Sequence, residues 1–334
     1  MELQGKTILI TGIGGFIGLR AAEMAVQRGM KVRGIQRTAE KAQAARALGA
    51  EVVIGSITDP AVTERACQGV DIVLHTAAIV REEGDVNKFM DTNVGGTLNL
   101  AKTAKAAGVR CFVHLSSVMV YGYSYPNHVN ESGPLYTGDN PYCKTKVEAE
   151  KQLLPLNDSD FGIITIRPGD VYGPRSLVWV VRPLQLMKKR LFVLMDGGRN
   201  IINHIYVDNL IDGIFLAIEK EAYGEAFNLT DGAATTWREY ATWLSKISGM
   251  PKPISLPGFV VRTLVKLRIS DDSISMSSID VLSRRYAYSI EKAWSVLGYQ
   301  PSISLEEGMA RTAEWLRKED IYSPEWIARA KASK

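Results

Sequence analysis

The feature that most constrains this chain is a glycine-rich segment directly after an apolar run near its start. The run Lys6–Thr11 (KTILIT) leads into TGIGGFIG, whose glycines have the spacing G-x-x-G-x-x-G, and then into residues 19–28 with helical periodicity. Glycines so placed allow a tight turn, a close approach of the backbone to a pyrophosphate, and close packing of helix on strand. The free amides that begin such a helix bind phosphate. The segment predicts a dinucleotide site formed by Gly12, Gly15, Phe16, Ile17 and Gly18.

Short apolar runs continue to alternate with helical segments through the first half of the chain. The further predicted strands are Lys31–Gln36, Glu51–Ile54, Asp71–His75, Cys111–Leu115 and Gly162–Arg167. The predicted helices between them are Thr38–Leu48, Asp59–Cys67, Val86–Ala107 and Tyr142–Leu154. Buried strands that alternate with helices are typical of a parallel sheet covered on both faces. We therefore predict an α/β protein with a Rossmann-type, doubly wound parallel sheet.

The regular alternation of predicted strands and helices ends at Pro168, and the segments beyond it are mixed in length and type. We predict helices at 183–189, 209–218 and 236–248, a strand at 226–229, and a pair of helices after residue 290. This organisation predicts a dinucleotide-binding domain at 1–170, to which part of 203–230 returns. Residues 171–334 then form mainly a smaller, mostly C-terminal α/β domain that binds substrate.

Composition excludes several classes of protein. The 334 residues include 40 basic and 36 acidic ones, a net charge of +4 that is too mild and too evenly spread for a nucleic-acid partner. The three cysteines lie far apart and the four histidines share no ligand spacing, so we expect neither a disulfide framework nor a metal site. No leader pattern begins the chain, and no uncharged apolar run approaches the ~18 residues that span a bilayer. We expect a cytoplasmic protein.

The same reasoning leads us to expect no membrane contact. One alternative stays open, because Leu256–Ile269 is apolar with cations at three positions (Arg262, Lys266 and Arg268) and such a segment can lie on a membrane surface.

The choice between NAD and NADP depends on the residue that ends the second strand. A carboxylate there binds the ribose 2′-hydroxyl of NAD, whereas this chain has Gln36 followed by Arg37. No acid repels a 2′-phosphate, and a guanidinium is available to bind one. We therefore expect NADP, with NAD as the open alternative if Arg37 is only a solvated surface charge.

A catalytic constellation lies at the start of one helix and the end of one strand. Tyr142 and Lys146 are four residues apart, so they share a helix face. The ammonium is expected to lower the pKa of the phenol, which then exchanges a proton with substrate. Ser117 follows the strand Cys111–Leu115 and is expected to orient the substrate oxygen, because ligands bind beyond the carboxyl ends of such strands.

Together these motifs resemble the extended short-chain dehydrogenases/reductases from end to end. The matching segments are TGIGGFIG, HTAA (75–78), TNVGGT (92–97), SSVMVYG (116–122), YCKTK (142–146), RPGDVYGP (167–174) and HIYVDNL (204–210). The resemblance implies a catalytic triad of Ser117, Tyr142 and Lys146. It also implies cofactor contacts from Ala77, Ala78, Ser116, Pro168 and Val171, an adenine pocket lined by Ser56 and Ile57, and a homodimer formed by the helices at 142–154 and 94–107. Asn93 is implied as a structural or proton-relay residue, or simply as a helix cap.

Two positions favour one branch of that family. Nucleotide-sugar epimerases and dehydratases usually have Asn at position 170 and Arg at position 202, whereas this chain has Asp170 and Ile202. Arg175 and Arg199 lie nearby in sequence and could replace the missing cation. Residues 206–209 and 283–301 look more like the 3β-hydroxysteroid dehydrogenase and dihydroflavonol 4-reductase branch.

We therefore expect an NAD(P)-dependent oxidoreductase that interconverts a secondary alcohol and a ketone on a fairly apolar small molecule. Val178–Val181 and Leu256–Ile269 would suit the walls of an apolar pocket, unless they form the core of the smaller domain. The alternatives are a nucleotide-sugar epimerase or dehydratase with tightly bound NAD(P), and a dinucleotide-sensing regulator that kept the fold.

Overall fold

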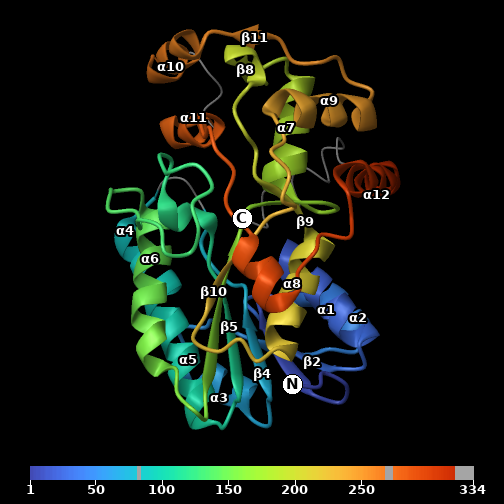
Figure 1. Ribbon diagram of the computed structural model, residues 1–334. Coiled ribbons are helices and arrows are strands. Elements are labelled where there is room, and N and C mark those ends of the chain that lie inside the picture. The colour runs from blue at the N-terminus through green and yellow to red at the C-terminus, as the bar shows by residue number, and fades with distance from the viewer. Residues whose placement is uncertain (81–83, 268–273, 320–334) are drawn as a thin grey trace.

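The main sheet positions everything that follows (Figure 1). The computed structural model describes residues 1–80, 84–267 and 274–319. Within these residues a seven-stranded sheet has the order β10-β6-β5-β4-β1-β2-β3, with all pairs parallel. Its strands are β1 (Thr7–Thr11), β2 (Lys31–Gln36), β3 (Glu51–Ile54), β4 (Ile72–His75), β5 (Cys111–Leu115), β6 (Gly162–Pro168) and β10 (Ala226–Leu229). The predicted Rossmann-type sheet is confirmed, and its order reverses between β1 and β4, where such sheets bind ligands.

Helices cover both faces of the sheet, because successive side chains of a strand point to opposite sides. They are α1 (Phe16–Gln27), α2 (Ala39–Ala47), α3 (Pro60–Cys67), α4 (Val86–Phe89), α5 (Thr97–Ala106), α6 (Pro141–Leu153) and α8 (Val207–Glu219). Ile8 and Ile10 of β1 pack in one core with residues of α1 and α8, whereas Leu9 packs in a second core with residues of α3 and α5. Figure 1 shows α1, α2 and α8 on one side of the sheet, and α3, α5 and α6 on the other.

Local sequence explains where one of the site's helices begins, and a second helix contains an irregular segment. Asn140 caps α6 by accepting a hydrogen bond from the Cys143 amide at 3.0 Å, and Pro141 occupies the first turn. The predicted helix Val86–Ala107 is continuous but contains a π-helical segment, Met90–Gly96, between α4 and α5. Such segments are rare and often lie at functional sites.

The rest of the chain forms a smaller unit beyond the carboxyl ends of the strands. Its strands pair as β7 (Asp170–Tyr172) with β9 (His204–Tyr206) and β8 (Leu194–Met195) with β11 (Ser255–Leu256). Its helices are α7 (Arg182–Lys188), α9 (Trp237–Ser248), α10 (Gly258–Lys266), α11 (Met276–Leu282) and α12 (Leu305–Lys318). Thr236 caps α9, and Glu239 completes a capping box with it.

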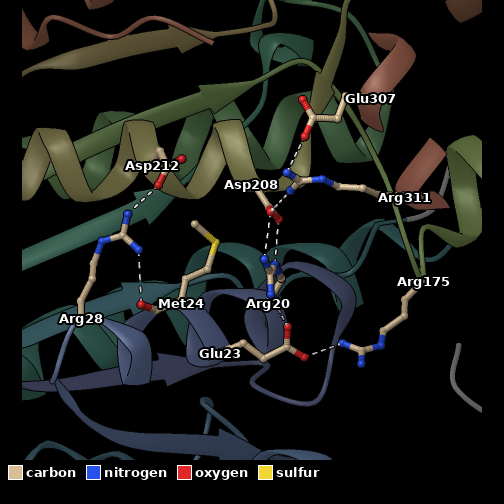
Figure 2. Close-up of polar contacts among 9 residues, drawn as sticks. All are labelled: Arg20, Glu23, Met24, Arg28, Arg175, Asp208, Asp212, Glu307 and Arg311. Carbon is tan, nitrogen blue, oxygen red and sulfur yellow. Dashed lines mark hydrogen bonds and ion pairs between the residues drawn. The ribbon is translucent and has the colours of Figure 1, made fainter. Parts of the chain in front are cut away.

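A charged seam joins α1, α8 and α12 (Figure 2). We use this name for Arg20, Glu23, Arg175, Asp208, Glu307 and Arg311. Arg20 donates to both carboxylate oxygens of Asp208, at 2.7 and 2.9 Å, and Arg311 donates to the same carboxylate at 3.2 Å. The seam thus ties the first helix of the sheet domain to the last helix that the structure describes.

None of the helices within residues 1–80, 84–267 and 274–319 combines the length and the apolar character needed to span a membrane.

Candidate active site

The glycine turn has the backbone geometry of a phosphate cradle. Gly12 has a φ of +65°, and a Cβ there would lie 3.3 Å from the Cα of Ala77. A Cβ on Gly18 would lie 2.4 Å from the carbonyl oxygen of Gly12, so the helix start requires a glycine at that place too. Helix α1 begins at Phe16 with no side-chain cap and no acidic residue in its first turn. The backbone amides at the start of α1 can therefore bind the pyrophosphate of a dinucleotide, and the residues present fit that cofactor.

Gly14, which the predicted spacing skips, fixes the loop to the next helix. A Cβ at Gly14 would lie 2.1 Å from the carbonyl oxygen of Lys41 in α2, so the two main chains are in contact. The Gly14 amide donates to the side-chain oxygen of Gln36 at 3.2 Å. Gln36 at the end of β2 is therefore turned toward the glycine turn and serves to support it.

Two cations lie beside that end of β2. Arg37 is exposed, and partial burial together with the charge of Arg37 lowers the pKa of Lys41. Arg37 was predicted to contact the cofactor, whereas Lys41 was not. The signal was available, because Lys41 is four residues after Arg37 in the helix that packs on Gly14.

A chain of buried hydrogen bonds connects β1, β4 and the π-helical segment. The Thr11 hydroxyl bonds the Nδ1 of His75 at 2.7 Å, and the Nε2 of His75 bonds the Thr97 hydroxyl at 2.8 Å. Because Thr97 donates its own hydrogen to the Asn93 carbonyl at 2.7 Å, the Nε2 of His75 carries the ring hydrogen. Burial lowers the pKa of His75 to about 3, so this neutral ring has a structural role. The chain also positions Ala77, whose amide donates to Thr11 at 3.1 Å.

The structure brings the three predicted catalytic residues together. The Ser117 side chain interacts with the Tyr142 phenol and lowers its pKa, and the Ser117 hydroxyl accepts from the Met119 amide at 3.1 Å. Lys146 Nζ lies 5.9 Å from the centre of the Tyr142 ring and donates to the carbonyl oxygen of Leu115 at 2.6 Å. A strand end and one helix face thus define a compact acid–base site.

The protonation of this site differs from the expectation in one respect. Burial raises the pKa of Tyr142 to about 12, although the Ser117 hydrogen bond opposes the shift. The expected lowering by Lys146 is therefore wrong for the chain by itself, because the loss of solvation is the larger effect. Burial also lowers the pKa of Lys146 to about 8, and the charge of Glu150 opposes that shift. At neutral pH Tyr142 is a phenol with a proton to donate.

The other residues predicted to contact the cofactor lie around the same edge of the sheet. Pro168 ends β6, and Val171 is buried in β7. Ala78 follows Ala77 after β4. At the end of β3, the Ser56 hydroxyl is 2.8 Å from that of Thr58, and the side chain of Ile57 is buried.

Two predicted residues are engaged in ways that the sequence did not indicate. The Ser116 hydroxyl donates to the Glu150 carboxylate, so this side chain is already committed within the protein. The Asn93 side chain donates to the Ile79 carbonyl at 3.1 Å and accepts from the Ile79 amide at 2.7 Å. Asn93 thereby holds the segment that follows Ala78. Glu150 itself was missed, since a buried carboxylate cannot be told from a surface one by helical spacing.

Position 170 has a partner from a distant part of the chain. Asp170 forms a buried ion pair with Arg284, which is fully buried. Burial raises the pKa of Asp170, and the charge of Arg284 opposes that shift. Ile202 is fully buried, and Arg175 is bound to Glu23 in the charged seam at 2.9 Å. Arg175 therefore does not replace the missing cation of the epimerases, and Arg199 is exposed.

A cavity of about 440 Å³ adjoins the start of α6. Its lining residues come from the loop after β4, the loop after β5, the start of α6 and helix α11: Gly84, Val86, Tyr123, Tyr136, Asp139, Asn140, Pro141, Ser277 and Asp280. This volume is within the range of small-molecule pockets. Pro141 in this lining directly precedes Tyr142 at the start of α6.

The apolar segments expected to wall a pocket are largely core. Val180 and Val181 are buried in the main core, and Val261 and Val265 are buried in a smaller one beneath α10. The outer side of α10 is different, because Phe259 is 74% exposed.

The three cysteines are free and buried. In the part of the chain that the structure describes, no three His, Cys, Asp or Glu side chains form a group that could hold a metal ion.

Fold and site together are those of an extended short-chain dehydrogenase/reductase. The chain belongs to the NAD dependent epimerase/dehydratase family, whose model matches residues 8–230. The resemblance inferred from the motifs is thus confirmed, and the coarser statement about the cofactor holds, since the family is NAD-dependent.

Named relatives cover almost the whole chain. A 4-hydroxy-2-methyl-3-oxo-4-farnesyl-3,4-dihydroquinoline-1-oxide ketoreductase of Stigmatella aurantiaca is 27% identical over 90% of this chain and 93% of its own length. A 3-beta-hydroxysteroid dehydrogenase of Mycolicibacterium neoaurum is 30% identical over 91% of this chain and 89% of its own. Among solved structures, UDP-glucuronic acid 4-epimerase from Bacillus cereus, in complex with NAD, superimposes with a TM-score of 0.76 at 23% identity, covering 93% of this chain and 99% of that one. That last likeness shows the fold alone.

Proposed function

We propose that this protein is an NADP(H)-preferring reductase that converts a ketone to a secondary alcohol on a fairly apolar small molecule. The observation that carries the proposal is the contact of Ser117 with the Tyr142 phenol, one helical turn from Lys146, with a cavity of suitable volume at the start of the same helix. Two relatives named as a ketoreductase and a 3-beta-hydroxysteroid dehydrogenase support this reaction class.

The roles of the chain's own residues follow from their protonation and contacts. Ser117 orients the substrate oxygen, and Tyr142, which holds its proton at neutral pH, donates it to that oxygen as the alcohol forms. Lys146 stabilises the phenolate that remains after the proton has left. The bound dinucleotide, held at the glycine turn and the start of α1, supplies the hydride to the carbonyl carbon.

The preference for NADP is argued from the end of β2. Gln36 carries no charge and accepts a hydrogen bond from the Gly14 amide. Arg37 and Lys41 provide two cations at the end of β2, where the 2′-phosphate of NADP would lie. A guanidinium and an ammonium both bind phosphate well. We expect Arg37→Ala to raise the KM for NADPH at least tenfold, about 1.4 kcal/mol, and to change the KM for NADH little.

Three features argue against a nucleotide-sugar substrate. Position 202 is a fully buried isoleucine, and position 170 is an aspartate paired with Arg284. The cavity at the start of α6 includes Asp139 and Asp280 in its lining, which disfavours a diphosphate.

The test is a screen of NADPH and NADH oxidation against apolar ketones and nucleotide sugars. We expect NADPH turnover with a subset of the ketones, and a loss of 10²- to 10⁴-fold in kcat for Tyr142→Phe. Tyr223→Phe, at the opposite end of β6, is the matched control and should keep full activity. Purified protein that carries tightly bound cofactor, reduces no ketone and epimerises a nucleotide sugar would overturn the proposal.

A further inference from the structure

We propose that Glu150 is a positioning residue for this reaction, because its buried carboxylate anchors the strand end that carries Ser117 and lies one helical turn from Lys146 on the same face of α6. The inference rests on the proposed function for its catalytic meaning, and its central measurement needs no substrate.

Glu150 lies on the catalytic face of α6. Tyr142, Lys146 and Glu150 follow each other at intervals of four residues, which places them on one side of the helix. Its side chain is only 9% exposed. The carboxylate accepts the Ser116 hydroxyl, while Lys146 donates to the Leu115 carbonyl at 2.6 Å. Two consecutive residues that lead into Ser117 are therefore held by two consecutive turns of α6.

The orientation of the carboxylate is fixed from the opposite side by Arg167 of β6. Arg167 donates to both carboxylate oxygens, at 3.1 Å from Nε and at 2.6 Å from a terminal nitrogen. Its other terminal nitrogen donates to the Tyr121 hydroxyl at 2.7 Å and to the Glu131 carbonyl at 3.0 Å. A bidentate pair in which all three guanidinium nitrogens are engaged leaves the carboxylate little freedom.

Glu150 is the charged group that acts on the pKa of Lys146, because the other titratable groups named here are neutral. His75 and His114 are buried and neutral, since burial lowers the pKa of both. Tyr142 keeps its proton, because burial raises its pKa to about 12. Burial lowers the pKa of Lys146 to about 8, and the charge that acts against this shift is that of Glu150, the partner of Arg167.

The sign of the effect follows from these charges. Removing the carboxylate's charge makes the site more positive. This disfavours the ammonium of Lys146 and favours the phenolate of Tyr142. The pKa of Lys146 falls, because its ammonium loses a favourable neighbour, and the pKa of Tyr142 falls as well. Ketone reduction needs both protons, so the alkaline limb of its pH profile moves to lower pH.

The experiment uses the full chain with Glu150→Gln, which keeps the size of the side chain and an acceptor for Ser116. Lys146 is titrated by NMR in protein with ¹³C-labelled lysine, and its signal is assigned with Lys146→Arg. We expect its titration midpoint to fall by about one pH unit, which corresponds to a tenfold change in its protonation equilibrium. The alkaline limb of kcat/KM should move in the same direction, while Glu150→Asp should stay closer to the unmodified protein.

Glu148→Gln is the matched control, because Glu148 lies on the same helix but binds Gln152 at the surface. If Glu150→Gln does not fold, Glu150→Gln with Arg167→Gln removes both charges and pairs two amides, and the midpoint of Lys146 should still fall. An unchanged midpoint in a folded variant overturns the inference, whatever the activity. An unmodified protein that reduces no ketone overturns the proposed function, while the titration of Lys146 still decides the role of Glu150.

Discussion

Two clusters of charge in this molecule use the same chemistry in different surroundings. The pair Glu150–Arg167 has side-chain exposures of 9% and 6%. In the charged seam Asp208 is equally buried, at 9%, but its partners Arg20 and Arg311 are 29% and 41% exposed. Each cluster joins an arginine to a carboxylate bidentately. The first includes Glu150, on the same helix as Tyr142 and Lys146, and the second joins α1, α8 and α12 (Figure 2).

Burial decides whether an ion pair acts only on its own partners or also on groups several ångströms away. Charges near water are screened, so the seam acts mainly through local hydrogen bonds. Charges that are buried act over several ångströms, which is why Glu150 influences Lys146. A buried pair is also demanding, because loss of one partner leaves the other charge unsolvated.

Breaking the buried pair should have the largest effect. Arg167→Met leaves the Glu150 carboxylate without its main partner, and we expect a loss of about 3–5 kcal/mol in the free energy of unfolding. Urea denaturation measures this loss. Arg110→Met is the control, because its pair with Asp160 is exposed at 57% and 88%, and it should cost little. A loss below about 1 kcal/mol for Arg167→Met would remove the distinction between the two clusters.

The pH dependence of reduction should reflect the buried cluster alone. Because the pKa of Lys146 is lowered to about 8, its ammonium is lost as pH rises through that value. We expect kcat/KM for ketone reduction to be flat near neutrality and to fall about tenfold per pH unit above about 8. Asp208→Asn in the seam should leave the limb in place. A limb that moves with Asp208→Asn would show that the seam also acts at long range.

The seam itself should respond moderately and with a dependence on salt. Asp208→Asn removes the carboxylate that Arg20 and Arg311 share, although Arg20 keeps Glu23 and Arg311 keeps Glu307. We expect a loss of about 1–2 kcal/mol in the free energy of unfolding. The loss should shrink at high ionic strength, whereas that of Arg167→Met should not. Denaturation series at low and high salt compare the two directly.

The smallest effect is expected at the outer end of the seam. Arg175 is 46% exposed, and within the seam its one ion pair is with Glu23. Arg175→Ala should change the free energy of unfolding by less than about 0.5 kcal/mol. Thermal unfolding would detect a larger loss. Such a loss would show that Arg175, in the loop after β7, is strongly coupled to the rest of the seam.

Much of the sheet domain could be predicted because each segment has its own periodicity. The runs 31–36, 51–54 and 226–229 coincide with β2, β3 and β10. The Asp59 cap, with Pro60 after it, marks the start of α3 in the sequence as in the structure. The four strands β7, β8, β9 and β11 were missed, because segments of two or three residues are too short to show alternation.

The grouping of the three candidate catalytic residues could be predicted because it depends on short spacings along the chain. Tyr142 and Lys146 are one helical turn apart, and Ser117 follows a strand. The pairs Glu150–Arg167 and Asp170–Arg284 depend on which elements become neighbours in three dimensions, and no local pattern records that. The raised pKa of Tyr142 could not be predicted either, since it results from the burial of the phenol in the folded protein.

The contact between Gly14 and the main chain of Lys41 has a consequence for protein engineering. A loop grafted from an NAD-using enzyme would have to reproduce the path of the α2 backbone to within a few tenths of an ångström, because no side chain separates the two segments. Point exchanges at positions 37 and 41 leave that scaffold intact, whereas an exchange at position 36 removes the hydrogen bond to the Gly14 amide. Redesign of nucleotide preference in this protein is therefore better attempted by swapping side chains than by transplanting the loop.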